Sequence, residues 1–419
     1  MDVLEDLKYR GLINQITDLD GLAKQLNSGS CVLYCGFDVT ADSLQLGNLL
    51  ALLTLKRFQL FGHRPIALLG NGTSLIGDPS GKKTERILNS KKTVANWSGS
   101  LKRQMEKVMS AGGKNKAKVI GNYDWLGKIK MIDFVRDIGK HFSIGAMLAK
   151  ESVKSRIETG ISFTEFSYML LQSYDFLRLH EDYGCSLQIG GSDQWGNITA
   201  GTDLIRKISQ AEVYGLTFPL ITKSDGTKFG KTESGAIWLD AAKTSSYQFY
   251  QFWINVDDQD VVPFLKYFTF LSREAIDRLE GEAKLHPEKR EAQKVLAKEM
   301  TILIHGEKAF ADAEKISQAL FYGDIKSLSK KQIQEALVNV PTVSLKEPEG
   351  IKIIDFLVIS GVSPSKRQAK EDIESSAISI NGEVWADVEK SLRFSDRLFG
   401  EYIVIKKGKK NYFLVQWLG

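Results

Sequence analysis

Two short segments, about 180 residues apart, carry side chains suited to binding phosphate groups. The first, Leu46 to Asn48, follows an apolar run at 31–35 and leads into leucines at helical spacing, which predicts a strand, a loop and a helix start able to bind an anion. The second, Lys228 to Thr232, places two lysines and a hydroxyl around a glycine, so ammonium groups can meet phosphate while the backbone approaches closely. Each segment alone is typical of an ordinary helix start or of a solvated surface turn.

Four motifs give these segments a context. In chain order they are Tyr34-Cys35-Gly36-Phe37-Asp38, Ile76-Gly77-Asp78-Pro79-Ser80-Gly81-Lys82, Gly190-Gly191-Ser192-Asp193-Gln194-Trp195-Gly196-Asn197 and Lys228 to Ser234. In this order the chain resembles the bacterial tyrosyl-tRNA synthetases, which belong to class I of the aminoacyl-tRNA synthetases, over essentially all 419 residues. The resemblance implies a tyrosine–tRNA ligase that activates L-tyrosine with ATP, releases diphosphate and transfers the tyrosyl group to the 3′ end of tRNA(Tyr).

Activation of an amino acid requires its carboxylate to attack the α-phosphorus of ATP while pyrophosphate leaves. Because this nucleophile is already charged, no general base is needed, and catalysis comes from positioning and from stabilising charge on the phosphates. The resemblance assigns the catalytic positions to Thr40, Gln45, Asn48, Lys82, Arg86, Lys228, Lys231 and Thr232. It assigns ATP binding to Gly36, Asp38, Gly47 and Asp193, and also to Lys231, which is one of the catalytic positions. Mg²⁺ is expected to arrive with ATP, and no tightly bound protein metal is expected.

Selection of the amino acid falls to a different set of residues. Tyr168, Gln172 and Asp175 are spaced i, i+4 and i+7 and therefore share one helix face, which spacing alone would assign to solvent. The resemblance instead places them in the tyrosine pocket, where Tyr34 and Asp175 hold the phenolic hydroxyl. It gives the ammonium group to Asp78, Tyr168 and Gln172, and brings Gln194 near the substrate. A buried Asp and Tyr paired to a substrate hydroxyl would reject phenylalanine, because that ligand leaves them unpaired.

One departure from the family pattern keeps a second interpretation open, and another bears on the strength of the dimer. Gln45 and Asn48 stand where the first signature normally has histidines, so amide donors replace imidazole and the option of positive charge near pyrophosphate is lost. Gly145 and Ala146 replace an Asn-Tyr pair in the stretch that resembles the subunit interface. The alternative is a paralogue with weak or no adenylation that acts as an RNA-binding or regulatory protein. A tryptophanyl enzyme fits less well, because Tyr34 and Asp175 prepare a pocket for a hydroxyl.

The elements that must position these residues follow an α/β pattern. From Cys31 to about Leu220, short β-rich runs alternate with longer helical patterns, which predicts a doubly wound parallel sheet of Rossmann type. Residues 246–319 read as mostly helical, and residues 323–350 change to a Lys-, Ser- and Pro-containing stretch typical of a linker with some helix in it. We therefore predict a catalytic domain at 1–220, a signature loop and helical domain at 221–322, a linker at 323–350 and a small α+β domain at 351–419.

The tail at 351–419 is similar to the S4 RNA-binding fold found at the carboxyl end of bacterial tyrosyl enzymes. It reads as two helices followed by a strand, a turn and a basic hairpin. Its candidate RNA-binding residues come from the second helix and from the hairpin: Lys366, Arg367, Lys370, Lys407 and Lys410. The alternative is that the hairpin lysines keep an edge strand soluble. Basic residues on two elements of one module favour RNA binding.

The composition excludes several classes of protein. With 43% hydrophobic residues the chain can bury a sizeable core, and it has neither a signal peptide pattern nor an apolar run long enough for a membrane helix. Three cysteines in apolar or glycine-rich stretches and five scattered histidines indicate neither a disulfide framework nor a zinc site. We therefore expect a cytoplasmic protein, a homodimer that binds tRNA across its subunits and does not bind membranes. A net charge of +5 permits a polyanionic partner without requiring one.

Overall fold

The computed structural model describes most of the chain and divides it into two compact units. It describes residues 2–81, 84, 88–109, 112–157, 160–224, 226, 229–232, 235–338, 340–346, 350–408 and 411–418, and only the backbone of 152, 155, 231 and 232. The first unit comprises Met1–Thr244 and Val256–Ile304, and the second comprises Ser245–Asn255 and His305–Gly419. Within the described part of the chain, no helix is long and apolar enough to cross a membrane.

The first unit is built on a six-stranded sheet in the order β1-β6-β5-β2-β3-β4. Its strands are β1 (Gln15–Ile16), β2 (Val32–Asp38), β3 (Arg64–Gly70), β4 (Lys118–Gly121), β5 (Cys185–Gly191) and β6 (Tyr214–Phe218). All neighbours run parallel except the edge pair β1–β6. The strand order reverses direction between β2 and β5, and in such sheets ligands bind beyond the carboxyl ends of the strands at this switch point. The predicted doubly wound sheet is confirmed, with one antiparallel edge strand added.

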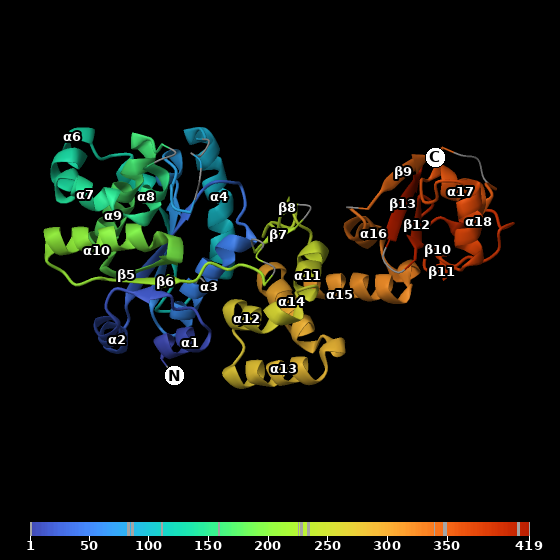
Figure 1. Ribbon diagram of the computed structural model, residues 1–419, viewed down its shortest axis with the longest axis horizontal. Helices are drawn as coiled ribbons and strands as arrows, with labels where there is room; N and C mark the ends of the chain where they lie inside the picture. The colour runs from blue at the N-terminus through green and yellow to red at the C-terminus, as the bar shows by residue number, and fades with distance from the viewer. Residues whose placement is uncertain are drawn as a thin grey trace. The chain divides into compact units, whose positions relative to one another are not determined.

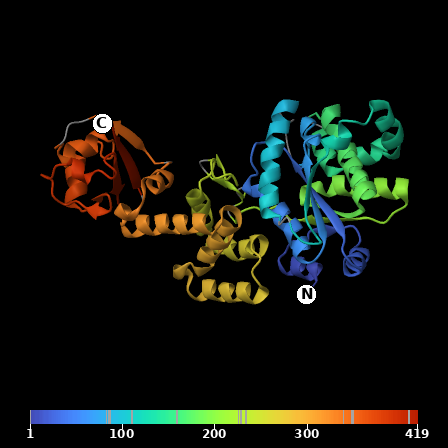
Figure 2. The ribbon, with the colours of Figure 1, turned by 180° about the vertical axis from the view of Figure 1, so that it is seen from behind.

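Helices cover both faces of this sheet (Figures 1 and 2). Leu33, Cys35 and Phe37 alternate along β2 with Val32 and Tyr34, and all five are buried. Val32 and Tyr34 pack with residues of α9 and α10, while α3 contacts β2 and β3 on the side from which α4 covers β3 and β4. The helices up to the second signature are α1 (Val3–Tyr9), α2 (Leu19–Asn27), α3 (Leu46–Leu60), α4 (Lys91–Val108), α5 (Tyr123–Leu126), α6 (Met131–Asp133), α7 (Ile144–Leu148), α8 (Glu151–Ile157), α9 (Phe163–Tyr183) and α10 (Trp195–Ser209), with a π-helical turn at Phe134–Ile138 and 3₁₀ turns at Thr73–Leu75, Gly139–His141 and Ser192–Gln194.

Local sequence signals set the start of α3 and both ends of α9. Asn48, at the third position of α3, accepts a hydrogen bond from the backbone N–H of Gln45 over 3.0 Å, which caps the helix start. Ser162 caps α9 in the usual way, accepting from the N–H of Glu165 over 3.2 Å. Gly184 ends α9 with φ +66°, a left-handed conformation that glycine adopts without strain, and β5 begins at the next residue.

The chain beyond the second signature contributes helices to both units. In the first unit lie the hairpin β7 (Lys231–Thr232) and β8 (Gly235–Ala236), α12 (Asp258–Phe268), α13 (Arg273–Leu285), the 3₁₀ turn Pro287–Lys289 and α14 (Glu291–His305) up to Ile304. In the second lie α11 (Ser246–Ile254) and α15 (Glu307–Tyr322). The helical character predicted for 246–319 is confirmed. The structure does not group these helices into one domain at 221–322, because α11 and α15 pack against each other and α12 packs against α3.

The second unit surrounds a five-stranded sheet in the order β11-β10-β12-β13-β9. Its remaining elements are a 3₁₀ turn (Ile325–Ser327), α16 (Lys330–Ala336), β9 (Thr342–Leu345), α17 (Ile353–Ile359), α18 (Lys366–Glu374), β10 (Ile378–Ile380), β11 (Glu383–Val384), a 3₁₀ turn (Phe394–Asp396), β12 (Tyr402–Lys407) and β13 (Asn411–Trp417). Along β12, Ile403 and Ile405 pack with α17 and α18, while Tyr402 and Val404 pack with α15 and α16. The helices, strand, turn and hairpin predicted for the tail are all present.

The segment 323–350 differs from the predicted linker. Its strand β9 pairs in parallel with β13, and Ile333 of α16 packs into the same cluster as Leu414. The sequence hid this role, because Lys- and Ser-rich flanks surround short apolar runs whose partners lie about 70 residues later. The sheet order also shows that the hairpin lysines do not protect an edge strand, as the alternative interpretation held. The hairpin strand β12 is central, and β11 and β9 form the edges.

Candidate active site

A cavity of about 540 Å³ opens beyond the carboxyl ends of β2, β3 and β5 in the first unit. It lies at the switch point of the sheet, and its volume falls in the range typical of sites for small molecules. Its walls include most of the active-site residues predicted from the sequence: Tyr34, Gly36, Asp38, Gly47, Asn48, Asp78, Tyr168, Gln172, Asp175, Asp193 and Gln194. The three residues of the α9 face thus point into the cavity, and not into solvent as their spacing alone suggested.

At one side of the cavity, a phenol and a carboxyl group are buried together. Tyr34 is 1% exposed and packs against Phe176 with ring centroids 5.3 Å apart. Its hydroxyl has no hydrogen-bond partner among the described residues. Burial raises the pKa of Tyr34 well above its usual value, and the nearby Asp175 carboxylate adds to this shift. A buried hydroxyl left unpaired in this way costs free energy that a ligand hydroxyl can recover.

Asp175 is fixed by two residues that the sequence did not reveal. Its carboxylate accepts from Asn122 Nδ2 over 2.8 Å and from Trp125 Nε1 over 2.7 Å. Burial raises the pKa of Asp175 to about 7, and these two hydrogen bonds oppose the shift. Asn122 directly follows β4, so a polar residue at the end of an apolar strand was the signal available in the sequence.

A second cluster links β2 to α9. Tyr168 donates from its hydroxyl to the carboxylate of Asp38 at 3.1 and 3.2 Å, and Thr73 donates to the same carboxylate over 2.9 Å. Burial raises the pKa of Tyr168 well above its usual value, and the charge of Asp38 adds to this shift. Tyr168 therefore remains a neutral donor, and Asp38 is a fixed acceptor at the cavity wall.

A third cluster joins the loop after β3 to the start of α10. Gln194 donates from Nε2 to Asp78 over 2.7 Å, and the amide of Asn197 donates to the side-chain oxygens of Gln172 and Gln194, each over 3.2 Å. The same Asn197 amide also reaches Ser80 over 3.3 Å. Asn197 is thus a buried hub among predicted residues, although only its motif, and not its role, was visible in the sequence.

The first signature lies along the cavity rim. The side-chain oxygen of Asn48 caps Gln45, so its amide NH₂ remains as the donor of a cavity-lining residue. A Cβ atom built on Gly36 or Gly47 would meet no atom within 4 Å, so the glycines leave room for a ligand there. Thr40 is exposed, and neither Thr40 nor Gln45 lines this cavity.

The second signature meets the first through backbone contacts. Gly230, with φ +77°, lies so close to α3 that an added Cβ would be 3.1 Å from Leu46 Cβ and 3.4 Å from Gly47 N. The N–H of Ile237 donates to Gly230 O over 3.0 Å, and the N–H of Leu46 donates to Ile237 O over 2.9 Å. The predicted cations Lys82, Arg86 and Lys228 lie outside the described residues, as do the side chains of Lys231 and Thr232.

The described wall of the cavity is acidic. It carries the carboxyl groups of Asp38, Asp78, Asp175 and Asp193, and no lysine or arginine among the described residues lines it. Such a wall suits a ligand with an ammonium group, while phosphate groups require cations from elsewhere in the chain. Across the described part of the protein, no group of three or more His, Cys, Asp and Glu side chains is placed to hold a metal ion.

Comparison with known proteins agrees with this geometry. Residues 26–322 match the family model "tRNA synthetases class I (W and Y)". The chain belongs to this family. Residues 332–415 match a second family model, the tyrosine–tRNA ligase SYY-like C-terminal domain, which begins inside the predicted linker.

Relatives of this class I synthetase align over its full length. It is 60% identical over 420 residues to a tyrosine–tRNA ligase of Geobacillus kaustophilus (strain HTA426), with all of both chains covered. It is 56% identical to tyrosine–tRNA ligase 1 of Bacillus subtilis (strain 168), with 99% of each chain covered. Among solved structures, a C-terminally truncated mitochondrial tyrosyl-tRNA synthetase of Aspergillus nidulans is 31% identical, with a TM-score of 0.70 over 76% of this chain and 94% of that one.

Proposed function

We propose that this class I synthetase is a tyrosine–tRNA ligase that forms tyrosyl-adenylate from L-tyrosine and ATP and transfers the tyrosyl group to tRNA(Tyr). The observation that carries the proposal is the buried Tyr34 hydroxyl, unpaired among the described residues and next to an Asp175 carboxylate that Asn122 and Trp125 hold in place. A tyrosine hydroxyl can donate to Asp175 and accept from Tyr34. Phenylalanine would leave both groups desolvated and unpaired.

The remaining clusters fit the other end of the amino acid. Asp78, Gln172 and Tyr168 offer a carboxylate, an amide oxygen and a hydroxyl to an ammonium group, and the acidic wall strengthens this attraction. The tyrosine carboxylate would then face the side of the cavity where β2 ends and α3 begins. There the N–H groups and positive dipole of the α3 start favour the phosphates of ATP.

The adenylation step needs no base from the protein. The tyrosine carboxylate forms a bond to the α-phosphorus, and the bond to the pyrophosphate oxygen breaks. We assign the stabilisation of the developing charge to Lys82, Arg86, Lys228, Lys231 and Thr232, with further donors from Thr40, Gln45 and Asn48. Mg²⁺ would enter with the triphosphate, whose oxygens it prefers as ligands.

Tyrosine-dependent ATP–pyrophosphate exchange tests the proposal directly. We expect exchange with tyrosine and very little with phenylalanine, and Tyr34→Phe should narrow this preference by about 0.5–1.5 kcal/mol, the contribution of one neutral hydrogen bond. Equal exchange with both amino acids would refute the assignment. Exchange that is absent while tyrosine still binds would favour the adenylation-weak RNA-binding paralogue that Gln45 and Asn48 keep open.

An exposed apolar surface supports the homodimer. At one end of the first unit, neighbouring elements α6, the π-turn, α7 and the start of α9 present side chains that are 42–81% exposed: Met131, Ile132, Val135, Ile144, Leu148 and Phe163. Soluble monomers rarely leave such a group uncovered. Gly145 and Ala146 lie in α7 beside it and are themselves exposed. Sedimentation of the protein and of Phe163→Asp measures this association, and a monomeric natural protein would refute it.

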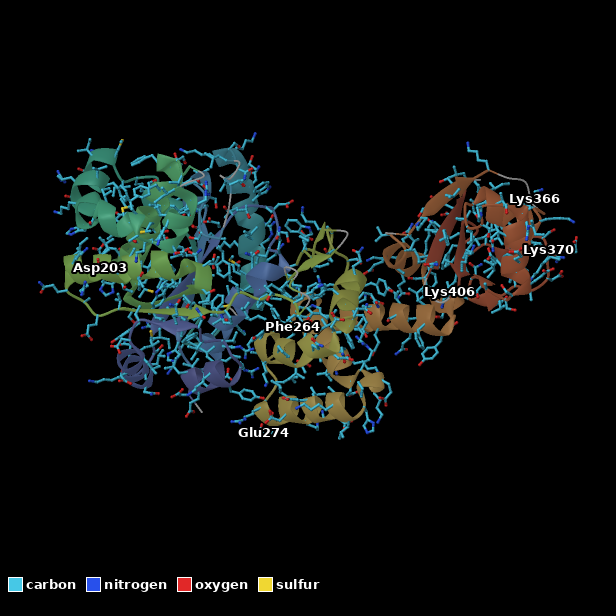
Figure 3. All side chains as sticks on the ribbon, in the orientation of Figure 1. Asp203, Phe264, Glu274, Lys366, Lys370 and Lys406 are labelled. Atoms are coloured by element: carbon cyan, nitrogen blue, oxygen red, sulfur yellow. The ribbon has the colours of Figure 1, made fainter. Side chains whose placement is uncertain are left out.

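The second unit is proposed to bind tRNA. Lys366, Arg367 and Lys370 are exposed on α18, and each pairs with a carboxylate, at 2.6, 3.1 and 3.7 Å. Figure 3 labels Lys366 and Lys370. Surface ion pairs of this kind are weak, so phosphates can replace the carboxylates. Lys407 differs because it bonds to the poorly exposed Asp372 over 2.6 Å, and Lys410 lies outside the described residues.

A further inference from the structure

One face of helix α12 holds the chain on both sides of Lys228. Before this residue, Ser224 donates from its backbone N–H and its hydroxyl to the carboxylate of Asp260, over 3.1 and 3.2 Å. Asp260 is buried in the first turn of α12. A carboxylate that accepts both donors of one serine fixes that residue more firmly than a single bond would.

After Lys228, an aromatic side chain is seated on the same helix. The ring of Phe229 stacks on that of Phe268 at 20° with centroids 4.9 Å apart, and meets that of Phe264 at 73° and 5.0 Å. Phe264 and Phe268 also meet edge to face at 5.8 Å, so the three rings form one cluster. Figure 3 labels Phe264 on α12. Offset and edge-on pairs at such distances are favourable beyond the area they bury.

The residues that make these contacts form a single stripe. Asp260, Phe264 and Phe268 are spaced i, i+4 and i+8, which places them on one face of the helix. Val261 and Leu265, also buried, lie beside this stripe. Ser224 and Phe229, which flank Lys228 in the sequence, are therefore both held by one face of α12.

The other side of the segment touches the nucleotide-facing start of α3. Phe229 lines the cavity as well as contacting α12. The next residue, Gly230, lies against Leu46 and Gly47 with almost no spare room. A shift of Phe229 on α12 would therefore be transmitted to the chain that carries Lys231 and to the start of α3.

Helix α12 is itself tied to the far end of α3. Arg57 of α3 donates from Nη2 to the carbonyls of Lys266 and Tyr267 over 3.3 and 3.1 Å, and Arg10 donates to the carbonyl of Lys266 over 3.0 Å. Asp6 pairs with both arginines, at 2.8 Å for Arg10 and 3.6 Å for Arg57. Cations at the last carbonyls of a helix are favourable, and this buried network fixes the C-terminal end of α12 relative to α3.

We propose that the stripe Asp260–Phe264–Phe268 of α12 positions the signature segment on the triphosphate, and that Phe229 is the positioning residue through which it acts. The inference rests on the proposed function, because the step that Phe229 assists is the proposed adenylation. Phe229 itself touches no reacting atom. The alternative is that Phe229 only fills the core. Its place directly between Lys228 and Gly230, and its contact with the cavity, argue that its location sets that of the phosphate-binding cations.

Phe229→Leu tests the positioning role. It leaves an apolar residue in the cluster but removes the stacking surface. At saturating tyrosine we expect single-turnover adenylate formation to slow by about 10–10²-fold, the scale of a misplacement near 1 Å, with a raised KM for ATP. Tyrosine binding measured by equilibrium dialysis should be unchanged. Phe229→Met should recover most of the rate, because methionine packs well against aromatic rings.

Phe58→Leu is the matched control. Phe58 is fully buried in the last turns of α3, near the end of the helix opposite Gln45, so the same substitution removes the same atoms from a core position away from the cavity. Its adenylation rate should stay near that of the natural protein even where its thermal midpoint falls as far as that of Phe229→Leu. If Phe229→Leu does not fold, Ser224→Ala removes a contact at the other end of the stripe without disturbing the core, and should slow adenylation in the same selective way.

A double-mutant cycle separates positioning from packing. If Phe229 acts by placing the lysines, Phe229→Leu should cost much less in adenylation rate when Lys231 is already alanine. Equal costs in both backgrounds, or equal rates for Phe229→Leu and Phe58→Leu, would overturn the positioning role while leaving the ligase assignment intact. A natural protein that forms no tyrosyl-adenylate would overturn the proposed function and this role with it.

Discussion

Asn122 donates from Nδ2 to Asp175 Oδ2 over 2.8 Å, while its own Oδ1 accepts from the backbone N–H of Gly72 over 2.7 Å. One buried amide therefore links the chain after β4 to the chain after β3 and to the middle of α9. The polar side chains of these three segments meet at the carboxyl edge of the sheet. The location of the Asp175 carboxylate is thus set by the sheet itself, through a residue that does not need to touch the substrate.

Loss of this support should weaken tyrosine recognition. Trp125→Phe keeps an aromatic ring but removes the indole N–H that donates to Asp175 Oδ1, and Asn122→Ala removes the donor to Oδ2. Hydrogen bonds to charged groups contribute about 1.5–3 kcal/mol, so each change should raise the KM for tyrosine by about 10–10²-fold. Steady-state exchange kinetics measure this, with the KM for ATP as the internal control. An effect confined to ATP would contradict the role given to Asp175.

The raised pKa of Asp175 predicts how stability depends on pH. Its pKa is about 7 in the folded protein against 3.8 for the free side chain. Between these values the folded state holds a proton that the unfolded chain has released, so the contribution of this carboxyl to stability falls as the pH rises towards 7. Asp175→Asn removes the titration. Its free energy of unfolding relative to the natural protein should therefore increase by about 1–2 kcal/mol between roughly pH 5.5 and pH 8.5.

Urea denaturation at these two pH values provides the measurement. The comparison uses the change with pH, because the asparagine also leaves either Asn122 or Trp125 without an acceptor at every pH. A difference between variant and natural protein that stays constant with pH would show that Asp175 does not titrate in this range. Asp203→Asn, at a partly exposed position with a lowered pKa, should show no such increase above pH 5.5.

The elements of this fold were more predictable from sequence than the groups that join them. The strand at 31–35, the helix start at Leu46 and the tail helices follow from apolar periodicity and capping residues, which are local signals. The roles of Asn122, Trp125 and Asn197 could not be read from such signals, although Asn122 follows an apolar strand, because each acts on partners contributed by other elements through the tertiary fold. The same reason hid β9, whose strand character depends on pairing with β13. Family resemblance located the pocket residues, but not what holds them.

Lys406 and Lys407 lie on opposite faces of β12 and should behave differently. Lys407 reaches Asp372, which also accepts from Ser363 over 2.7 Å, whereas Lys406 lies over the ring of Tyr412 with its ammonium 5.3 Å from the centroid. Lys407→Ala removes the cation that pairs with the poorly exposed carboxylate of Asp372. It should lower the free energy of unfolding of the protein by about 1–3 kcal/mol. Lys406→Ala should have a small effect on stability.

Thermal unfolding and tRNA binding at two salt concentrations distinguish the two lysines. Removing a lysine that contacts phosphate weakens binding to all RNA sequences about equally. It also reduces the slope of log affinity against log salt concentration by about one. We expect this signature for Lys366→Ala on α18 and not for Lys407→Ala below its unfolding transition. A reduced salt slope in Lys407→Ala with unchanged stability would show that the lysine leaves Asp372 to bind RNA.

Asn48 performs two tasks with two different atoms, which substitutions can separate. Its oxygen caps the N–H of Gln45, and its NH₂ is left for the cavity. Asn48→Asp keeps an oxygen for the cap and places a negative charge at a helix start, so stability should be retained or increased. The same charge faces the site of the triphosphate, so adenylate formation should fall by about 10²–10³-fold, the scale of losing a donor to developing charge.

Asn48→Ala should lose about 1 kcal/mol of stability as well as activity. Single-turnover adenylation alongside urea denaturation measures both quantities. Full activity in Asn48→Asp would mean that the amide makes no contact with the nucleotide, and that Gln45 and the signature lysines replace both family histidines without it.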